Sequence, residues 1–319
     1  MTEIFQISSP LLAQNRLSAP VGVLVSVVIV NWNRAADIVQ TLAHLRKQHH
    51  QSLEIIVVDN GSTDVSADVL AQIPGITLIR LLSNAGPARA RNVGANAASG
   101  PYLFFLDNDA SPGRNAIRRL VQYMEDHDDV GILGCRIMNS VSRRIDQWIY
   151  AQPYDTHGRQ SFDTYSFSAA GALIRADLFL SIGGFWEDLF IYNEEVDLAL
   201  RVIRAGYRVE YAPAATILHR AAPTGRVAPG AYFYYQIRNW IWIFRRHYPA
   251  LARQRKIALY CLLYIIKGLL AFRLGNVIRG IWDGLFRRRI VAAFPDKMTG
   301  AELVRYEQLN QRTSLRPGR

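Results

Sequence analysis

The segment Tyr102-Leu-Phe-Phe-Leu-Asp-Asn-Asp109 decides the fold, because an apolar run ends abruptly in two carboxylates separated by one residue. Such a run is typical of a strand buried on both faces, which delivers the following residues to the carboxyl edge of a sheet. That edge is where open α/β proteins bind ligands. Two acids held so close repel each other, and a divalent cation with oxygen ligands is the simplest way to relieve the repulsion. The other interpretation is a helix start, with Asp109 or Ser111 as the cap of a helix near Arg114.

The residues on either side of this segment alternate between strand and helix patterns. We predict strands at 25–30, 54–58, 76–82 and 102–106, with helices at 35–48 and 87–98 between them. Further strands are predicted near 130–138, 166–175 and 207–211, and a further helix at 194–205. Repeated β-α-β units have right-handed crossovers, so the sequence predicts an α/β fold with a mainly parallel sheet flanked by helices.

The composition limits the class of protein. The chain has 319 residues, half of them hydrophobic, which suits one large domain with an appendage and excludes wholesale disorder. Cys135 and Cys261 are its only cysteines, so there is neither a disulfide framework nor a cysteine metal site. The first residues carry an acid and lack a basic segment followed by an apolar one, so we expect no signal peptide and a cytoplasmic location.

The positive charge is concentrated near the C-terminus. Residues 226–290 contain thirteen Arg and Lys against one acid, Asp283, while the net charge of the whole chain is +11. The apolar run at 257–266 ends at Lys267 and is shorter than the roughly twenty residues of a spanning helix. Basic residues interleaved with Trp, Tyr and Leu are typical of helices that lie in a bilayer interface, so we expect peripheral attachment to the anionic inner face of the cell membrane. A helical appendage packed on the main domain would explain the apolar residues but not the charge.

The first predicted strand excludes the two commonest phosphate-binding loops. After Val30 the chain reads Asn31-Trp-Asn-Arg34, which contains neither a Gly-x-Gly-x-x-Gly turn nor a Gly-Lys-Ser/Thr loop. If a diphosphate binds, its negative charge must be neutralised in another way. A metal ion bound by Asp107 and Asp109 could neutralise it.

Five segments place polar residues directly after predicted strands or at predicted helix starts. They are Val25-Ser-Val-Val-Ile-Val-Asn-Trp-Asn-Arg34, Glu54-Ile-Ile-Val-Val-Asp-Asn-Gly-Ser-Thr-Asp64, Asn84-Ala-Gly-Pro-Ala-Arg-Ala-Arg-Asn92, Leu106-Asp-Asn-Asp109 and Asn193-Glu-Glu-Val-Asp-Leu-Ala-Leu-Arg201. In order and spacing they resemble the motifs of family 2 glycosyltransferases of the GT-A fold. The segment Tyr234-Tyr-Gln-Ile-Arg-Asn239 further resembles the rhamnosyltransferase-like branch of bacterial cell-surface polysaccharide enzymes. The resemblance implies a GT-A domain at 24–230, preceded by an N-terminal extension at 1–23. The charge and apolar pattern predict an amphipathic, basic helical region at 231–319 that associates with the membrane.

The resemblance also implies a donor site and a metal site. The residues expected to bind the nucleotide-sugar are Asn31, Trp32, Asp59, Asn60, Asn84, Gly86, Arg91 and Asp107. Asp109 would be the direct ligand of Mg²⁺ or Mn²⁺, Asp107 would contact the ribose or the metal, and His219 would complete the metal site. A lone histidine after a strand can equally be structural.

The expected catalytic base is Glu195, which stands where relatives usually have Asp and is therefore one methylene longer. Gly171, Trp186 and Glu194 are expected to contact the acceptor. Helix N-termini favour acids through their dipole, which would also explain Glu194. A buried strand crossing would equally explain the small residue at position 171.

The resemblance implies an inverting, metal-dependent glycosyltransferase that moves a sugar from a nucleotide-sugar to a hydroxyl of a glycan in cell-surface polysaccharide synthesis. Because we expect the protein to be attached to a membrane, we expect this glycan to be lipid-linked. One alternative is an enzyme that makes a polyprenyl-phosphate sugar. A second is a basic nucleic-acid-binding protein, as a pI near 9.9 would allow. Because the basic residues lie in an apolar helical tail and on no recognition motif, we expect no nucleic-acid partner.

Overall fold

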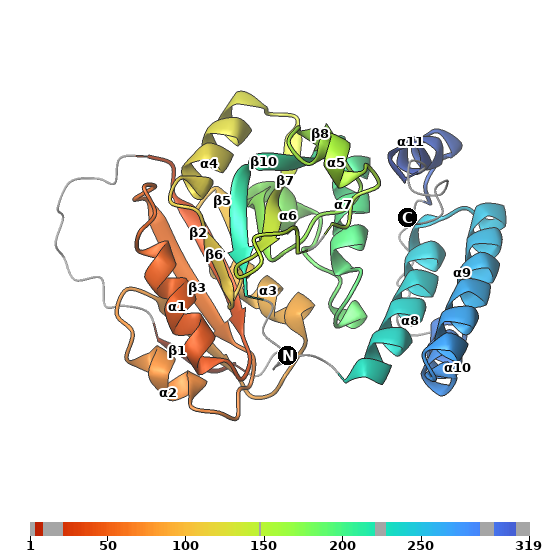
Figure 1. The fold of residues 1–319 in the computed structure, drawn as a ribbon, viewed down its shortest axis with the longest axis horizontal. Coiled ribbons are helices and arrows are strands. Elements are labelled where there is room, and N and C mark those ends of the chain that lie inside the picture. Colours follow the sequence, from red (N-terminus) through yellow and green to blue (C-terminus); the bar gives the residue numbers. More distant parts are fainter. Residues whose placement is uncertain (1–3, 9–21, 147, 221–227, 288–296, 311–319) are drawn as a thin grey trace.

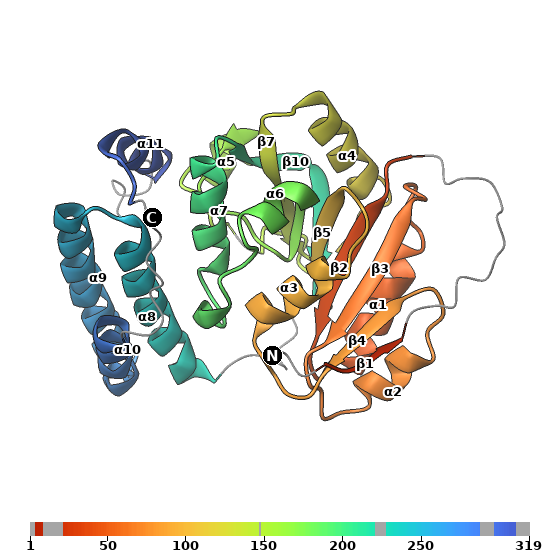
Figure 2. The same ribbon diagram turned by 180° about the vertical axis from the view of Figure 1, so that it is seen from behind.

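The computed structural model describes residues 4–8, 22–146, 148–220, 228–287 and 297–310. In these ranges a ten-stranded sheet occupies the centre, in the order β1-β4-β3-β2-β5-β9-β7-β10-β6, with β8 paired to β10. Helices cover both faces of the sheet, and further helices stand at one side of it (Figures 1 and 2). The strands are β1 Ile4–Ser8, β2 Val25–Asn31, β3 Leu53–Asp59, β4 Thr77–Leu81, β5 Tyr102–Asp107, β6 Ala110–Pro112, β7 Val130–Asn139, β8 Phe162–Asp163, β9 Gly171–Arg175 and β10 Arg208–His219. The helices are α1 Ala35–Leu45, α2 Ser66–Ala71, α3 Pro87–Asn96, α4 Ala116–Asp126, α5 Tyr154–His157, α6 Ala176–Ser181, α7 Glu194–Arg204, α8 Pro229–His247, α9 Ala250–Leu270, α10 Leu274–Phe286 and α11 Gly300–Asn310.

The predicted α/β fold with a parallel central sheet is confirmed. Strands β4, β3, β2 and β5 are parallel neighbours, and their register pairs Asn31 with Asp59 and Val30 with Asp107. The carboxyl ends of β2, β3 and β5 therefore meet at one edge. Outside this central part, β9 runs antiparallel between β5 and β7, and β1, from the predicted N-terminal extension, pairs antiparallel with β4.

The core has two layers because the side chains of a strand alternate between its faces. Val27 and Ile29 of β2 pack with Leu42 of α1 and with residues of α4 on one face. Val28 packs on the other face with Ala88 of α3 and with residues of α6 and α7. Burial on both faces explains why β2, β3 and β5 are continuous apolar runs.

Two segments near Asp109 differ from the sequence prediction. Residues 110–112 form strand β6, and helix α4 begins only at Ala116, so the interpretation of Asp109 or Ser111 as a helix cap is wrong. Strand β10 continues past the predicted end at Tyr211 to His219, paired in parallel with β7 and antiparallel with β6. Since His219 pairs with Ala110, the longer strand brings the histidine beside Asp109.

A buried ionic cluster attaches the C-terminal helices to the α/β domain. Asp197 of α7 is fully buried and accepts hydrogen bonds from Arg201 (2.7 Å), from Arg246 (3.1 Å) and from Nε2 of His247 (2.8 Å), the last two at the end of α8. Burial alone would raise the pKa of Asp197, but its three partners outweigh burial and hold it well below the usual value. Helix α8 is thus bound to α7 by charge as well as by apolar packing.

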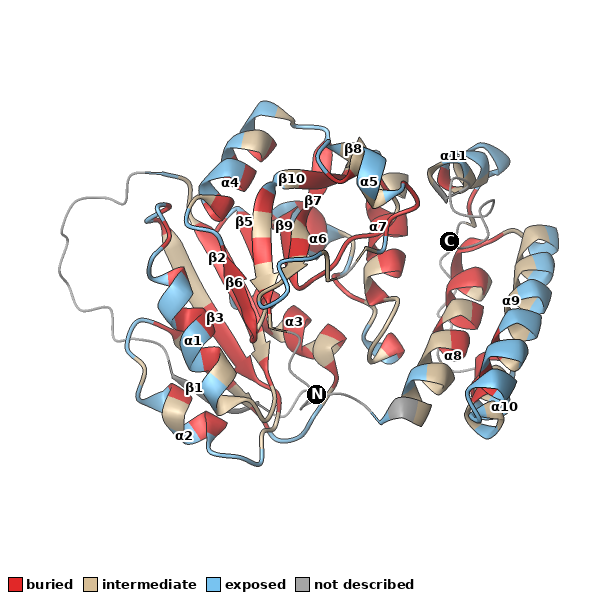
Figure 3. Ribbon diagram, viewed as in Figure 1, coloured by how far each residue is buried: buried red, intermediate tan, exposed pale blue. Residues whose placement is uncertain are grey.

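Helices α9 and α10 form an outer layer against α8. A few of their residues, such as Tyr264 and Val277, are buried, and most of the others are partly or largely exposed (Figure 3). The chain then returns to α8, where the backbone N–H of Met298 donates to the carbonyl of His247 and the ring of Tyr306 is buried beside Tyr248. Among the helices that the structure describes, none has the length and apolarity required to cross a membrane.

Candidate active site

A pocket of about 530 Å³ opens at the carboxyl edge of the parallel strands. Its walls come from residues that follow β2 to β5, from α3, from the segment before α7, from the start of α7 and from the end of β10. The lining residues are Val30, Trp32, Arg34, Asn60, Asn84, Pro87, Arg91, Asp107, Asn108, Asp109, Ser168, Ala170, Phe190, Ile191, Tyr192, Glu194, Glu195 and His219. The structure therefore brings most of the predicted site residues around one space.

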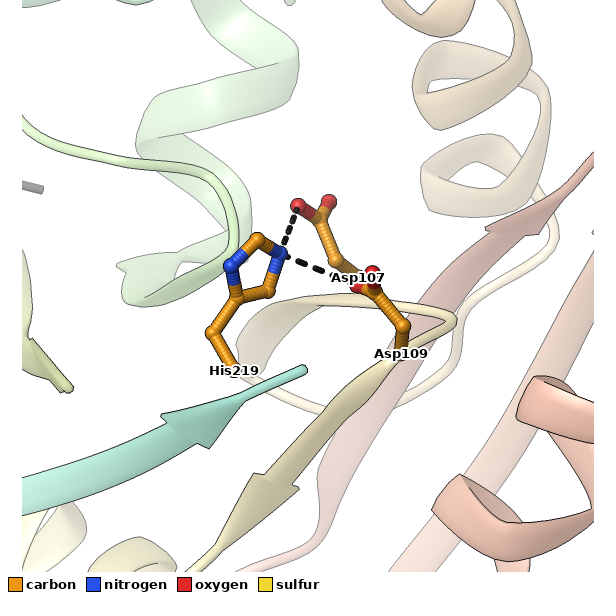
Figure 4. Close-up of side chains that lie close together, drawn as sticks. All are labelled: Asp107, Asp109 and His219. Carbon is orange, nitrogen blue, oxygen red and sulfur yellow. Dashed lines mark ion pairs between the residues drawn. The ribbon is translucent and has the colours of Figure 1, made fainter. Parts of the chain in front are cut away.

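Asp107, Asp109 and His219 converge on one wall of the pocket (Figure 4). Nε2 of His219 lies 3.0 Å from Oδ1 of Asp109 and 3.7 Å from Oδ2 of Asp107. One possible ligand atom from each residue lies within 4.8 Å of the others. Two carboxylates and an imidazole are a donor set that divalent ions such as Mg²⁺ and Mn²⁺ accept. These three residues fit the metal site that the sequence predicts.

The electrostatics of this wall favour a cation. Burial alone would lower the pKa of His219, but its hydrogen bond with Asp109 and the charges of Asp107 and Asp109 raise that pKa to about 9. Nη1 of Arg34 lies 2.6 Å from Oδ2 of Asp109. The two acids thus attract positive charge from two directions, and a divalent ion would supply such charge at the same place.

Asp146 contacts the far side of the imidazole and was not predicted from the sequence. Its Oδ2 lies 2.6 Å from Nδ1 of His219, which leaves Nε2 facing Asp107 and Asp109. A carboxylate on the second nitrogen is the usual way to orient a metal-binding histidine. Asp146 lies 73 residues before His219 and belongs to no motif, so the sequence carries no signal for it.

The residues predicted to bind the nucleotide-sugar fall into two groups: some line the pocket, and others lie behind its wall. Trp32, Asn60, Asn84, Arg91 and Asp107 line the pocket. Asn60 donates to Oδ1 of Asn84 (3.1 Å), and this contact joins the loops after β3 and β4.

Asn31 and Asp59 lie outside the pocket lining and are fully buried behind it. Oδ1 of Asn31 accepts from Asn108 (2.9 Å), and Oδ1 of Asp59 accepts from the hydroxyl of Ser62 (2.5 Å). Asn31 also donates to Asp59 over 3.4 Å. These bonds fix the loops that carry Trp32 and Asn60. Because Asn31 and Asp59 do not line the pocket, their expected contacts with the nucleotide-sugar remain predictions.

Gly86 has a backbone role at this wall. Gly86 directly precedes α3 and has a φ of +84°. Residues with a Cβ rarely adopt a φ in this range. A Cβ at this position would lie 2.6 Å from Cδ2 of Phe190. Glycine therefore permits the close approach of Phe190, which lines the pocket.

Glu194 and Glu195 stand at the N-terminus of α7 and line the same pocket as Asp107, Asp109 and His219. Nη1 of Arg91 lies 3.0 Å from Oε1 of Glu194, and Nη2 lies 3.4 Å from Oδ1 of Asp107, so one guanidinium joins the two acidic walls. Burial lowers the pKa of Arg91, but the charges of Glu194 and Asp107 outweigh it and raise that pKa. In the part of the chain that the structure describes, Oε2 of Glu194 has no hydrogen-bond partner and can accept one from a ligand.

Both glutamates have raised pKa values. Burial and the neighbouring charge of Glu195 raise the pKa of Glu194 to about 8, against the opposing effect of Arg91. Burial also raises the pKa of Glu195, again opposed by Arg91. A carboxylate in a pocket with a pKa shifted toward neutrality suits proton transfer.

Gly171 and Trp186, both expected to contact the acceptor, lie outside the pocket lining. A Cβ on Gly171 would lie 2.5 Å from Cγ1 of Ile217, so packing between β9 and β10 by itself requires a glycine. The ring of Trp186 packs 4.3 Å from the guanidinium of Arg246, toward α8. Acceptor contacts for these two residues stay predictions that the described pocket does not support.

Residues 26–183 match the family model described as Glycosyl transferase family 2. Glycosyltransferase GlyG of Streptococcus pneumoniae is 32% identical over 35% of this chain and 38% of GlyG. The uncharacterized glycosyltransferase YwdF of Bacillus subtilis is 29% identical over 63% of this chain and 75% of YwdF. The pre-mycofactocin glycosyltransferase of Mycobacterium tuberculosis is 30% identical over 61% of this chain and 42% of that protein. The match thus spans well under half of two of these three relatives.

Solved structures resemble the fold at low sequence identity. The mannosyltransferase PcManGT from Pyrobaculum calidifontis, in complex with GDP-Man and Mn²⁺, has a TM-score of 0.59 at 18% identity over 85% of this chain and 89% of that one. Residues 1–349 of TarS from S. aureus, in complex with UDP-GlcNAc, have a TM-score of 0.59 at 16% identity over 82% of this chain and 80% of that one. These likenesses support the GT-A fold.

Proposed function

This chain is a family 2 glycosyltransferase with the GT-A fold, and we propose that it moves a sugar, with inversion, from a nucleotide-sugar donor to a hydroxyl group of a glycan acceptor. Similar structures hold GDP-Man with Mn²⁺ or UDP-GlcNAc, which supports a nucleotide-sugar donor and Mg²⁺ or Mn²⁺ as the cofactor. The motif at 234–239 supports a rhamnosyltransferase-like enzyme of bacterial cell-surface polysaccharide synthesis.

The single observation that carries this proposal is the pairing of two acidic walls in one pocket. The metal-type residues Asp107, Asp109 and His219 form one wall, and Glu194 and Glu195 form the other. Sugar transfer needs charge neutralisation on the leaving diphosphate and a base for the attacking hydroxyl. The geometry offers a separate group for each task.

In the proposed reaction, Glu195 accepts the proton of the acceptor hydroxyl while that oxygen bonds to the anomeric carbon from the face opposite the nucleotide. The bond between this carbon and the diphosphate oxygen breaks, and the nucleoside diphosphate leaves with the electron pair. Asp107, Asp109 and His219 would hold Mg²⁺ or Mn²⁺, which acts as a Lewis acid toward the leaving diphosphate. Arg91 keeps a positive charge between the two walls.

A hydroxyl acceptor suits this pocket better than a polyprenyl phosphate. A phosphate is already anionic and needs little base catalysis, whereas the pKa values of Glu194 and Glu195 are both raised toward the range of a working base. The acidic side chains would also repel a second phosphate.

A nucleotide-sugar screen tests the donor. Purified protein is heated with Mn²⁺ and each of a panel of nucleotide-sugars, and the right donor raises the melting temperature because it binds only the folded state. Product formation with that donor is then compared between wild type and Glu195→Gln. A melting temperature that no nucleotide-sugar shifts, with or without Mn²⁺, would contradict the proposal.

We further propose that α9 and α10 bind an anionic membrane surface at the inner face of the cell membrane, where a lipid-linked acceptor would be met. The outer side of these helices exposes large apolar side chains, with Leu270 78% exposed, Phe272 89% and Trp282 64%. The other large apolar residues of these helices that are exposed are Leu251, Leu259, Leu262, Leu263, Ile266, Leu269, Ile278, Leu285 and Phe286. So large an apolar surface on one pair of helices indicates an interaction site.

The charge of this surface supports an anionic membrane as its partner. The exposed basic residues of α9 and α10 and their ends are Arg255, Lys267, Arg273, Arg279 and Arg287. The one acid in these helices, Asp283, is partly buried and accepts a hydrogen bond from Tyr234. Exposed apolar side chains can enter the acyl boundary of a bilayer, and the basic residues among them can bind its anionic headgroups.

Vesicle sedimentation tests the membrane proposal. Phe272→Ser combined with Trp282→Ser should abolish sedimentation with anionic vesicles, and wild type should detach partly in high salt. Val141→Ser combined with Leu180→Ser is the matched control, because both residues are exposed and apolar but lie in the α/β domain. Wild type that ignores anionic vesicles at low salt would overturn the proposal. Substitutions are preferable to truncation at Ala250, since truncation would also remove the buried Tyr306.

A further inference from the structure

The segment between Trp186 and Glu194 forms one wall of the pocket and has an unfavourable backbone. Phe190 has φ 63° and ψ −67°, and the N–H of Ile191 donates to the carbonyl of Leu189 (2.7 Å), which together define a γ-turn of the strained kind. Tyr192 and Asn193 follow with φ of 69° and 64°. Residues other than glycine adopt such backbone angles only where the surrounding structure enforces them. Something must therefore hold this wall loop, residues 187–193, in place.

Asn239 of α8 provides the main restraint. Its amide nitrogen lies within hydrogen-bonding distance of three wall-loop carbonyl oxygens, those of Leu189 (3.0 Å), Ile191 (2.9 Å) and Tyr192 (2.7 Å). The Asn239 side chain is fully buried. One side chain thus contacts carbonyl groups on both sides of the γ-turn.

Three neighbours on α8 complete the restraint. Nη2 of Arg238 donates to the carbonyl of Leu189 (2.8 Å), and its Nε donates to Oδ1 of Asn239 (2.9 Å), which orients the amide. Gln236 accepts a hydrogen bond from the side chain of Asn193 (3.2 Å). Phe190 also stacks on Tyr235 at 5.4 Å.

We propose that Asn239, oriented by Arg238, is a positioning residue for catalysis, because it fixes the wall loop that leads directly into Glu194 and Glu195. The wall loop contributes Phe190, Ile191 and Tyr192 to the pocket, and α7 begins one residue after it. A displaced loop would move the carboxylate of Glu195 relative to the acceptor. The catalytic part of this inference rests on the proposed function, in which Glu195 is the base.

Asn239→Leu tests the proposal, since leucine is of similar size and favours a helix but donates no hydrogen bond. We expect kcat to fall by roughly 10²-fold, as a misplacement of about 1 Å can produce. Binding of the nucleoside diphosphate with Mn²⁺, measured by calorimetry, should change little, because the residues expected to bind the nucleotide, such as Trp32, Asn60 and Asp107, lie outside the wall loop. The acid limb of the pH profile of kcat should also move, since the pKa of Glu195 depends on its position near Arg91.

Hydrogen exchange provides a readout that is independent of activity. The amides of the wall loop should exchange faster in Asn239→Leu than in wild type. Ile241→Ala is the control, because Ile241 is a fully buried residue of the same helix that packs against α9 and α10 and not against the wall loop. It should destabilise the protein while leaving kcat and the exchange of the wall loop unchanged.

The outcomes separate the two proposals. Faster exchange in Asn239→Leu, in a protein that transfers no sugar even as wild type, would support the restraint and refute the proposed function. Unchanged exchange and unchanged kcat in a folded Asn239→Leu would overturn the inference. If Asn239→Leu does not fold, Gln236→Leu at a partly exposed position should give the same changes to a smaller degree, and its failure to do so would equally overturn it.

Discussion

Asp197→Asn should strongly destabilise the protein, because Asp197 is the one carboxylate in the buried cluster that joins α7 to α8. The substitution keeps the size of the side chain and removes its charge. Arg201 and Arg246 would then both lose the carboxylate that they share. Burial already lowers the pKa of Arg246 to about 10 although Asp197 opposes this effect, so its charge depends strongly on that carboxylate.

The magnitude follows from the burial of the partners. The side chains of Asp197 and Arg201 are 0% and 4% exposed, and that of Arg246 is 10% exposed, so solvent does little to screen them. Removing one partner of a buried ion pair costs roughly 3–5 kcal/mol in the free energy of unfolding. At about 2–4 °C per kcal/mol, the melting temperature should fall by roughly 6–20 °C.

Thermal unfolding followed by tryptophan fluorescence measures this shift. Asp128→Asn is the matched control, because Asp128 is 97% exposed and lies 3.8 Å from Arg175 in a solvent-screened pair. It should change the free energy of unfolding by less than about 0.5 kcal/mol. If Asp197→Asn melted at the same temperature as Asp128→Asn, the cluster would not be what joins α7 to α8, and the reasoning would be wrong.

Four further predictions concern the pocket. Glu195→Gln should lower turnover by roughly 10²–10⁴ with donor binding nearly unchanged by calorimetry, and a larger loss in Glu194→Gln would assign the base role to Glu194 instead. Asp109→Asn should nearly abolish transfer and the Mn²⁺-dependent part of nucleotide binding, whereas wild-type activity that survives a chelator would exclude a metal role. Glu195 acts as a base only when it is deprotonated, and burial raises its pKa. As the pH decreases, kcat/KM should therefore begin to fall at a pH above the usual carboxylate pKa of about 4.3. A kcat/KM that stays constant down to about pH 4.3 would contradict this prediction. Asp146→Asn should weaken Mn²⁺ binding by roughly 10–100-fold in a titration with nucleoside diphosphate present, since Asp146 orients His219, and unaltered affinity would contradict that role.

The sequence by itself determined the central sheet and the edge at which the site lies. Strands buried on both faces read as continuous apolar runs, so β2, β3 and β5 could be located within one residue at each end. Parallel strands place the residues that follow them at a common edge, and the family resemblance assigned Trp32, Asn60 and Asp107 to one site there without coordinates. For these strands, the apolar pattern in the sequence agrees with their buried position in the folded sheet.

The side chains that support this site from outside the pocket could be identified only from the folded structure. Asp146 meets His219 across 73 residues, and Asn239 meets Leu189 across 50. Gly171 and Trp186 follow the family pattern in sequence, yet packing against Ile217 and Arg246 accounts for their positions outside the pocket. Periodicity reports which face of an element is buried, but it does not report what lies opposite that face. The partners are selected by strand register and helix packing among segments far apart in the chain, and these exist only once the whole chain has folded.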